Sequence, residues 1–387
     1  MERLVMALHY GADAVYLAGT QFGMRASAGN FDEAQLREAV RLAHSLGRRV
    51  YVTCNTLPRE EEFAALPAYL ELLQDAGADA LIIADLGVLE LAKRHAPRVS
   101  KHVSTQLGVI NSATANALYA LGADTVVLAR EAPLEDISRI RRNTPPELRL
   151  EAFVHGAMCV SFSGRCLLSN YLTGRDANRG RCAQPCRWKY HLVEEKRPGE
   201  YFEISEDGGT HIMNSRDMCM IEHIPELIEA GVDSFKIEGR MKSSYYAAVV
   251  TNAYRHAIDA AVSGEGLDRL WVDEVNKVSH RPYTTGFYFG EPGQYYHDAS
   301  YFTEADVAAV VEDCDAEGNA VLFQRNKFYK GDELELLKSD SAPIAFTVEH
   351  MYNAEGEEID DTRHAMMEIH MKLPTVAEKY SIIRKCR

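Results

Sequence analysis

Five of the eight cysteines in this chain of 387 residues lie close together in its middle third. Their spacing is C-x6-C-x15-C-x3-C, followed after 32 residues by one more, and the set is Cys159, Cys166, Cys182, Cys186 and Cys219. Structural zinc sites usually combine two close pairs of cysteines, and only one close pair occurs here. An iron–sulfur cluster also takes four thiolates but accepts irregular spacing. An iron–sulfur cluster is therefore favoured, while a zinc site and buried cysteines without a ligand stay open.

Basic residues accompany the cysteines, and they are Arg165, Arg175, Arg179, Arg181, Arg187 and Lys189. The whole chain has a net charge of −15, which argues against nucleic-acid binding by the surface at large. Guanidinium groups form paired hydrogen bonds with phosphates and carboxylates. We therefore expect four of these residues to bind an RNA backbone or a small dicarboxylate: Arg165, Arg175, Arg181 and Arg187.

Three aromatic residues lie in or beside the same stretch, namely Tyr171, Trp188 and Tyr190. Aromatic rings stack on unpaired RNA bases, so these residues are candidates for base contacts. Packing of a long loop onto the rest of the protein explains each of them equally well.

The chain around this stretch repeats one short phrase, in which a helix ends in Gly and an Asp precedes an apolar run. The phrase occurs at residues 11–13, 77–79, 122–124 and 231–233. The apolar runs predict strands at 14–18, 50–55, 80–85, 101–106, 125–130, 148–156 and 235–239. Seven or eight βα units in about 260 residues predict a TIM-type (β/α)8-like barrel. A doubly wound sheet is disfavoured, because no G-x-G-x-x-G follows the first strand.

Polar residues follow these strands at their carboxyl ends, where such barrels keep their active sites. They are Asn55, Asp85, Gln106, Arg130, Glu131, His155, Glu238 and Arg240. A helix cap or a loop hydrogen bond explains any one of them, but the set favours a polar pocket. We assign His155, Glu238 and Arg130 as candidate catalytic residues. Asn55, Gln106 and Arg240 are candidate substrate-binding residues.

The pattern changes after an expected helix at 242–262. We therefore divide the chain into a barrel at 1–270, with a cysteine-rich loop at 156–219, and a second domain at 283–387. Short β-rich runs with turns between them predict a small antiparallel β-barrel there, with strands at 307–314, 320–326, 332–338, 346–352 and 366–373. This domain offers no catalytic constellation and is expected to serve binding or docking.

The sequence also bears on the compartment. It has neither a secretory signal pattern nor a run of roughly eighteen apolar residues. A cytoplasmic location without membrane association is therefore expected, where thiols stay reduced and act as ligands more often than as disulfides.

The residues around the first two cysteines resemble a known signature. Glu151-x-Phe153-x-x-Gly156-Ala157-Met158-Cys159, followed by Gly164-x-Cys166-x-Leu168-Ser169, is similar to that of the peptidase U32 family. The phrases GADAVYL, STQ, VVLARE, GRCAQPCRW, NSRDMC and FKIEGRMKS agree, and the resemblance covers the whole chain. Members of this family were first labelled collagenase-like proteases. Others hydroxylate tRNA, 23S rRNA or a ubiquinone precursor without oxygen, and this chain looks most like the tRNA group.

The resemblance implies a 4Fe–4S cluster with Cys159, Cys166, Cys182 and Cys219 as ligands. Cys186 is an alternative to Cys219, because one branch of the family uses a C-x3-C pair. Hydroxylation of the wobble uridine of tRNA to 5-hydroxyuridine is the implied activity. The implied partners are tRNA and prephenate, with prephenate as the source of the hydroxyl group.

The resemblance also implies a first barrel strand before the first helix, whereas this sequence starts inside that helix. We therefore expect an open gap between the strands at 14–18 and 235–239, unless residues 211–214 fill it.

Other functions remain open. A peptidase needs a nucleophile and a base or a metal-bound water, and neither H-E-x-x-H nor G-x-S-x-G occurs. Cys159 with His155 is the one dyad that suggests itself, although four further thiols fit a cluster better. Hydroxylation of rRNA or of a quinone precursor is a second alternative. A non-catalytic subunit that pairs with a homologous U32 protein is a third.

Overall fold

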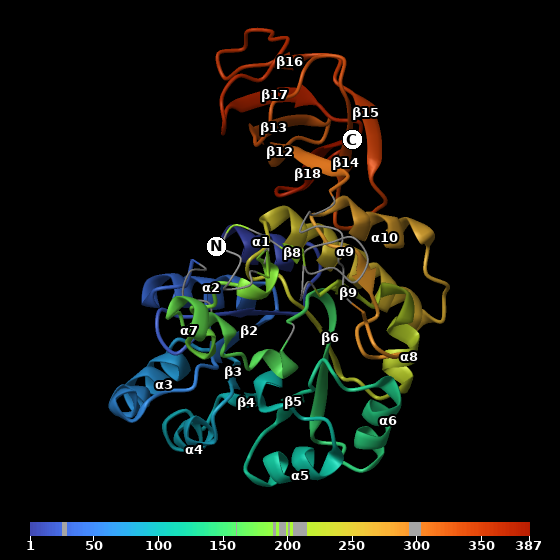
Figure 1. Cartoon of the computed structure of the whole chain (residues 1–387). Coiled ribbons are helices and arrows are strands. Elements are labelled where there is room, and N and C mark those ends of the chain that lie inside the picture. The colour runs from blue at the N-terminus through green and yellow to red at the C-terminus, as the bar shows by residue number, and fades with distance from the viewer. Residues whose placement is uncertain are drawn as a thin grey trace.

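The computed structural model describes residues 1–24, 29–159, 161–188, 191–192, 199, 202–203, 215–293 and 303–387. It has two parts, a barrel-like α/β unit and an antiparallel sheet formed by the C-terminal residues (Figure 1). In the described part of the chain, no helix combines the length and the apolar character that crossing a membrane requires.

Seven parallel strands form the wall of the barrel. They are β1 (Ala14–Leu17), β2 (Arg49–Cys54), β3 (Ala80–Ile83), β4 (Ser100–Val103), β5 (Thr125–Val127), β6 (Arg149–Ala157) and β10 (Ser234–Ile237). Each pairs in parallel with the next one in this order. The seven strands coincide with the seven predicted ones, and the TIM-like fold class is confirmed.

Helices lie outside this wall (Figure 1). They are α1 (Glu2–His9), α2 (Glu33–Ser45), α3 (Leu66–Asp75), α4 (Leu86–His95), α5 (Ser112–Ala120), α6 (Leu134–Arg142), α8 (Ile224–Glu229) and α9 (Ser244–Ser263). The last of these corresponds to the helix expected at 242–262. Their apolar faces cover the strands, whose central residues are buried on both sides, as in β3.

The repeated Gly–x–Asp phrase explains how the strands are held in register. Its glycines have positive φ values, such as 85° at Gly77, and close the preceding helices. The aspartate then accepts a hydrogen bond from the backbone N–H of a residue in the neighbouring strand. Asp79 binds the N–H of Val50 at 2.7 Å, and Asp233 binds that of Leu150 at 2.8 Å. Asp124 binds the N–H of Lys101 in the same way, so three of the four repeats link a strand to its neighbour in the sheet.

The cysteine-rich loop leaves the barrel after β6 and returns to it through β9 (Asp217–Cys219). This short strand runs antiparallel to the end of β6, with His155 opposite Cys219 and Ala157 opposite Asp217. A further strand, β11 (Tyr283–Thr284), pairs with β9. Both ends of the loop are therefore fixed beside the carboxyl end of β6.

Between these ends the loop contains several short elements. They are η3 (Phe162–Gly164), α7 (Leu168–Thr173), η4 (Ala177–Arg179), η5 (Pro185–Arg187), β7 (His191–Leu192) and β8 (Phe202–Glu203). The last two pair with each other.

The C-terminal sheet is antiparallel and curves into a half-barrel. Its strands are β12 (Ala305–Cys314), β13 (Asn319–Gln324), β14 (Glu333–Leu337), β15 (Ile344–Thr347), β16 (Met351–Tyr352), β17 (Glu368–Lys372) and β18 (Ile382–Cys386). Their order in the sheet is β15-β14-β18-β12-β13-β17-β16. The predicted strand at 346–352 divides into parts of β15 and β16, and β18 was not predicted although it lies in the middle of the sheet.

The two parts meet at α9 and α10 (Arg269–Glu274), above which the half-barrel sits (Figure 1). Arg384 of β18 is fully buried there and forms two 2.7 Å hydrogen bonds with Glu274. It also contacts Glu335 of β14 at 2.6 Å and the Tyr245 hydroxyl at 3.3 Å. Buried charges are tolerated where they are paired in this way, so this junction has one defined geometry.

Candidate active site at the carboxyl end of the barrel

The cysteine-rich loop is anchored at two points to the carboxyl end of the barrel. After β5, the Glu131 carboxylate accepts hydrogen bonds from the backbone N–H and the hydroxyl of Ser163, at 2.7 and 3.0 Å. After β2, the Glu62 carboxylate receives two hydrogen bonds from Arg179, at 2.8 and 2.6 Å. The Arg179 guanidinium holds the pKa of Glu62 at about 2, so this carboxylate stays charged. The loop therefore lies on the face where such barrels carry their chemistry.

Four thiols of this loop influence one another. Burial raises the pKa of Cys159, and the nearby Cys166 and Cys182 raise it further. Burial also raises the pKa of Cys186; Arg187 opposes this shift, whereas the other three thiols add to it. The structure thus brings Cys186 into the same neighbourhood as the three cysteines that both predicted ligand sets share.

Cys219 has a different environment. It packs against the barrel core, and its Sγ lies 3.8 Å from the hydroxyl of the buried Tyr254. Burial raises its pKa to about 11, which the Tyr254 hydroxyl and a backbone hydrogen bond partly offset.

The donor set suits a cluster in type and number, since thiolates are its usual ligands and the loop supplies four of them. Among the described residues, no three side chains of His, Cys, Asp or Glu lie close enough to hold a metal ion as they stand. Cluster binding would therefore require the loop to draw its thiols together, and the choice between Cys186 and Cys219 stays a prediction.

His155 is sealed inside the barrel wall. It is 1% exposed, and its Nδ1 and Nε2 atoms lie 3.3 Å from the hydroxyls of Tyr254 and Tyr283. Burial lowers the pKa of His155 to about 3, so the ring is neutral. Both ring nitrogens thus have tyrosine partners, whereas a nucleophile–base dyad would need one of them to face Cys159. Its catalytic role stays a prediction.

The other candidate catalytic residues also have defined partners. Arg130 donates a hydrogen bond to the carbonyl of Ala157 and lies over the ring of Phe153, 3.9 Å from its centroid. Glu238 accepts a 2.8 Å hydrogen bond from the hydroxyl of Tyr16 on β1. Arg130 therefore supports the strand that leads into the loop, while Glu238 follows β10 and lies beside the end of the same strand, where its backbone N–H donates to the carbonyl of His155 at 2.9 Å.

Three candidate substrate-binding residues converge near the loop after β1. The Asn55 amide nitrogen donates to Gln106 Oε1 at 2.9 Å, and Asn55 Oδ1 accepts from the N–H of Met24. The Arg240 guanidinium donates to the carbonyl of the same Met24 at 2.7 Å and to Asn30 at 3.2 Å. These side chains come from the ends of β2, β4 and β10, and their role in substrate binding stays a prediction. Asp85, by contrast, caps α4 by accepting from Val88 at 3.1 Å.

The remaining candidates lie on the loop. Arg165, Arg175 and Arg181 are exposed, and Arg187 is half-buried. Lys189, Tyr190 and residues 211–214 lie outside the described residues.

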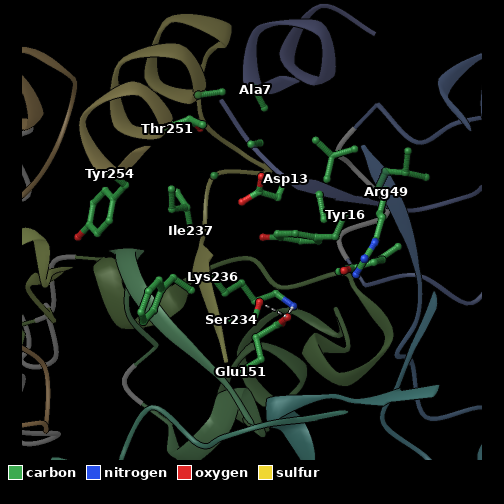
Figure 2. Close-up of a pocket in the computed structure, with 18 of the residues that line it drawn as sticks. Ala7, Asp13, Tyr16, Arg49, Glu151, Ser234, Lys236, Ile237, Thr251 and Tyr254 are labelled. Carbon is green, nitrogen blue, oxygen red and sulfur yellow. Dashed lines mark hydrogen bonds and ion pairs between the residues drawn. The ribbon is translucent and has the colours of Figure 1, made fainter. Parts of the chain in front are cut away.

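The predicted gap between β1 and β10 is present. Among the described strands, β1 pairs only with β2 and β10 only with β6. A cavity of about 630 Å³ occupies the space between them (Figure 2). Its lining includes Asp13, Tyr16 and Thr251.

An ion pair of the barrel interior lines this cavity (Figure 2). Lys236 Nζ lies 2.6 Å from Glu151, and the Ser234 hydroxyl donates to the same carboxylate at 3.0 Å. Burial alone would raise the pKa of Glu151, but Lys236 and His102 hold it below its usual value. Sequence analysis missed this pair and the anchor Glu62, and it placed Glu131 among the polar residues of the strand ends without recognising that this residue anchors the loop. A charged residue inside an apolar strand, as at Glu151 and Lys236, was the available signal.

Comparison with known proteins agrees with this architecture. The profile of Peptidase family U32 matches residues 1–298, and that of the Peptidase family U32 C-terminal domain matches residues 303–384. The tRNA hydroxylation protein P1 of Bacillus subtilis (strain 168) is 37% identical over 392 residues, which cover 100% of this chain and 92% of the relative.

Two relatives from Escherichia coli (strain K12) are also similar. The tRNA hydroxylation protein P is 35% identical over 401 residues, covering 92% of this chain and 88% of the relative. The 23S rRNA 5-hydroxycytidine C2501 synthase is 36% identical over 290 residues, covering 73% and 43%. With both regions matched along nearly its whole length, the chain belongs to the peptidase U32 family.

Proposed function

We propose that this protein hydroxylates the wobble uridine of tRNA to 5-hydroxyuridine in a reaction that does not use oxygen. The observation that carries the proposal is the arginine-rich loop with four neighbouring thiols, anchored over the carboxyl end of the barrel. Relatives that match most of the chain are named tRNA hydroxylation proteins, and a third is named for hydroxylation of rRNA. These names support RNA as the class of substrate.

In this proposal Cys159, Cys166 and Cys182 hold a 4Fe–4S cluster, with Cys186 or Cys219 as the fourth ligand. When bound, such a cluster would supply electron transfer or a binding site for a donor oxygen beside the barrel mouth. Prephenate is the proposed source of the hydroxyl group. Its two carboxylates are suited to paired hydrogen bonds with guanidinium groups of the loop.

The fixed side chains at the barrel mouth would orient the uracil ring. Asn55 and Gln106 are already hydrogen-bonded to each other, so their remaining amide positions are held in one orientation. Glu238 is held by Tyr16 and is the candidate to take or give a proton at the base. Arg240 is fixed between the loop after β1 and the end of β10, where it could contact a phosphate.

The test has two parts. Protein purified without oxygen should be brown and should contain iron and acid-labile sulfide in equal amounts. Nucleoside mass spectrometry of tRNA from a deletion strain should show loss of 5-hydroxyuridine and its derivatives, and the wild-type gene should restore them. A colourless protein with stoichiometric zinc, or unchanged tRNA in a strain without a redundant pathway, would refute the proposal. If a hydroxylated nucleoside is lost from rRNA alone, the substrate is rRNA instead of tRNA.

A further inference from the structure

The loop between residues 161 and 188 has an exposed face that carries both positive charge and aromatic rings. This segment contains five arginines and a single acidic residue, Asp176, in a chain whose net charge is −15. Arg179 is engaged by Glu62, and Asp176 accepts a hydrogen bond from the backbone N–H of Asn178 at 2.9 Å. Arg165, Arg175 and Arg181 remain exposed.

Three aromatic residues of the same segment are exposed. Phe162 in η3 is 52% exposed and its ring lies against Gly108, whereas Tyr171 on α7 is 80% exposed and Trp188, directly after η5, is 43% exposed. Single exposed apolar residues are common, but Leu167 and Leu172 of the same segment are exposed too, and several large side chains exposed among polar residues indicate a contact surface. Of the two roles predicted for Tyr171, packing onto the barrel is therefore the wrong prediction.

These residues belong to one folded unit. The buried Ser169 hydroxyl donates to the carbonyl of Arg175 at 2.7 Å and accepts from the N–H of Ala183 at 2.9 Å. The Arg175 guanidinium donates to the carbonyl of Arg181 at 3.2 Å. Helix α7 also packs against η5, which precedes Trp188. The backbone thus keeps the arginines and the rings together without the help of a ligand.

We infer that this face, which we call the arginine–aromatic face (Arg165, Tyr171, Arg175, Arg181 and Trp188), binds unpaired RNA. Bases stack on the two rings while the guanidinium groups contact the phosphates between them. A duplex cannot present its bases in this way, because they are already stacked and paired. The inference rests on the proposed function. It adds the surface on which the nucleotides around the target base are bound.

The charge distribution favours RNA over a protein as the occupant. The C-terminal domain, residues 303–387, contains eighteen acidic and ten basic residues, and the rest of the chain outside residues 161–188 has a net charge of −11, so positive charge is concentrated in this segment. A polyanion approaching the protein would therefore be attracted to the loop and repelled elsewhere.

Tryptophan fluorescence provides a direct test, because the chain has only two tryptophans. Trp271 is buried and stacks on His256, and Trp271→Phe would leave Trp188 as the single reporter. We expect an RNA hairpin with an unpaired loop to quench this reporter, and a blunt duplex of the same composition to leave it unchanged. Equal quenching by both RNAs would contradict base stacking.

Affinities of otherwise wild-type variants complete the test. We expect Tyr171→Ala to weaken hairpin binding by roughly 5- to 100-fold, the range for loss of one stacked base. Arg175→Gln with Arg181→Gln should lower the salt dependence by a slope of about 1.4, which corresponds to two phosphate contacts on a single strand. Tyr329→Ala and Arg363→Gln, at exposed positions of the C-terminal domain, are matched controls that should bind as the wild type does.

The outcomes separate this inference from the proposed function. Variants that bind the hairpin normally, while the wild type hydroxylates tRNA, would overturn the assignment of the face alone. Weakened binding together with unchanged 5-hydroxyuridine in the deletion strain would support the face and refute the proposed function. If Tyr171→Ala instead disperses an oligomer and leaves RNA affinity intact, the face is a protein interface and the inference fails.

Discussion

The cysteine-rich loop and the C-terminal half-barrel are stabilised in opposite ways. The half-barrel has its own apolar core, with Leu322, Phe328 and Leu336 almost fully buried, and a buried charge network connects it to the barrel. The loop buries few large apolar side chains and depends on discrete hydrogen bonds, such as those of Glu62 and Glu131. The difference indicates that the loop can rearrange around a ligand while the half-barrel keeps its shape.

The largest effect on activity is expected from a substitution in the cysteine-rich loop. Cys159→Ser should remove the iron of the anaerobically purified protein and abolish hydroxylation, because a cluster needs four ligands. The half-barrel should be unaffected, and Cys314→Ser on β12 is the matched control that should retain iron and activity. Full iron content in the Cys159→Ser protein would show that the loop thiols are not its ligands.

The same measurement identifies the fourth ligand. We expect Cys219→Ser to lose iron as Cys159→Ser does, and Cys186→Ser to keep it, as the family resemblance implies. This result would require the Cys219 thiol to leave Tyr254 when a cluster binds. The opposite pattern would assign the ligand to Cys186, which already interacts with the other loop thiols.

The next largest effect is on stability and is expected from a substitution in the half-barrel. Arg384→Ala removes two hydrogen bonds to the buried Glu274 carboxylate and leaves it paired with Lys277, and loss of one member of a buried pair costs at most about 3–5 kcal/mol. The free energy of unfolding, measured in urea, should fall by up to that amount. Arg387→Ala removes an exposed pair with Asp306 near the end of the same strand and should lower stability far less, because exposed ion pairs contribute little. Equal effects would mean that the junction does not depend on its buried charges.

A smaller effect, the dependence of stability on pH, is expected from two histidines of the barrel wall. Burial lowers the pKa of His155 to about 3 and that of His102 to about 4, from an ordinary value of 6.5. Both rings are charged first in the unfolded chain, so stability falls as pH drops through 6.5 and continues to fall towards those values. Each should contribute a slope of up to about 1.4 kcal/mol per pH unit.

Urea unfolding at several pH values tests this slope. His155→Gln should reduce it, whereas His350→Gln, at an exposed position of the half-barrel, should leave it as it is. An unchanged slope in the His155→Gln protein would show that this ring is not buried in its neutral form.

The smallest effect concerns a loop anchor. Glu62→Gln removes the charge that binds Arg179 in a partly exposed pair and should lower global stability by less than about 1 kcal/mol. Limited proteolysis within residues 161–188 should nevertheless become faster, while cleavage of the half-barrel stays constant. Unchanged proteolysis of both regions would mean that Glu131 alone holds the loop.

The sequence was sufficient to predict the elements that follow a local pattern. The seven parallel strands were predictable because each is an apolar run and four of them follow a Gly–x–Asp phrase, which itself forms strand contacts, as at Asp79 and Asp233. The gap between β1 and β10 was also foreseen, through the family resemblance.

Partners far apart in the sequence were not predictable. Nothing near Glu62 points to Arg179, and β18 has a short sequence whose central position depends on pairing with β12 and β14. The antiparallel return of the loop through β9 was missed because three residues are too few to show a period. The catalytic assignment of His155 rested on its position at a strand end, which does not reveal on which side of the wall a ring lies.

The apolar core of the barrel is itself divided into two clusters. One contains residues from Leu4 to Val99, and the other contains most of the barrel residues from Val103 onward. Asp13, whose counterparts Asp79 and Asp233 bind a neighbouring strand, instead pairs with Arg48 and Arg255. Helix α1 joins the two clusters, with Leu4 and Leu8 in one and Met6 and Tyr10 in the other.

The boundary between the two clusters falls between β3 and β4, where the strands remain hydrogen-bonded to each other. Asn55 follows β2 and Gln106 follows β4, so their hydrogen bond spans β3. It therefore links, at the carboxyl end of the barrel, two strands whose apolar side chains belong to different clusters.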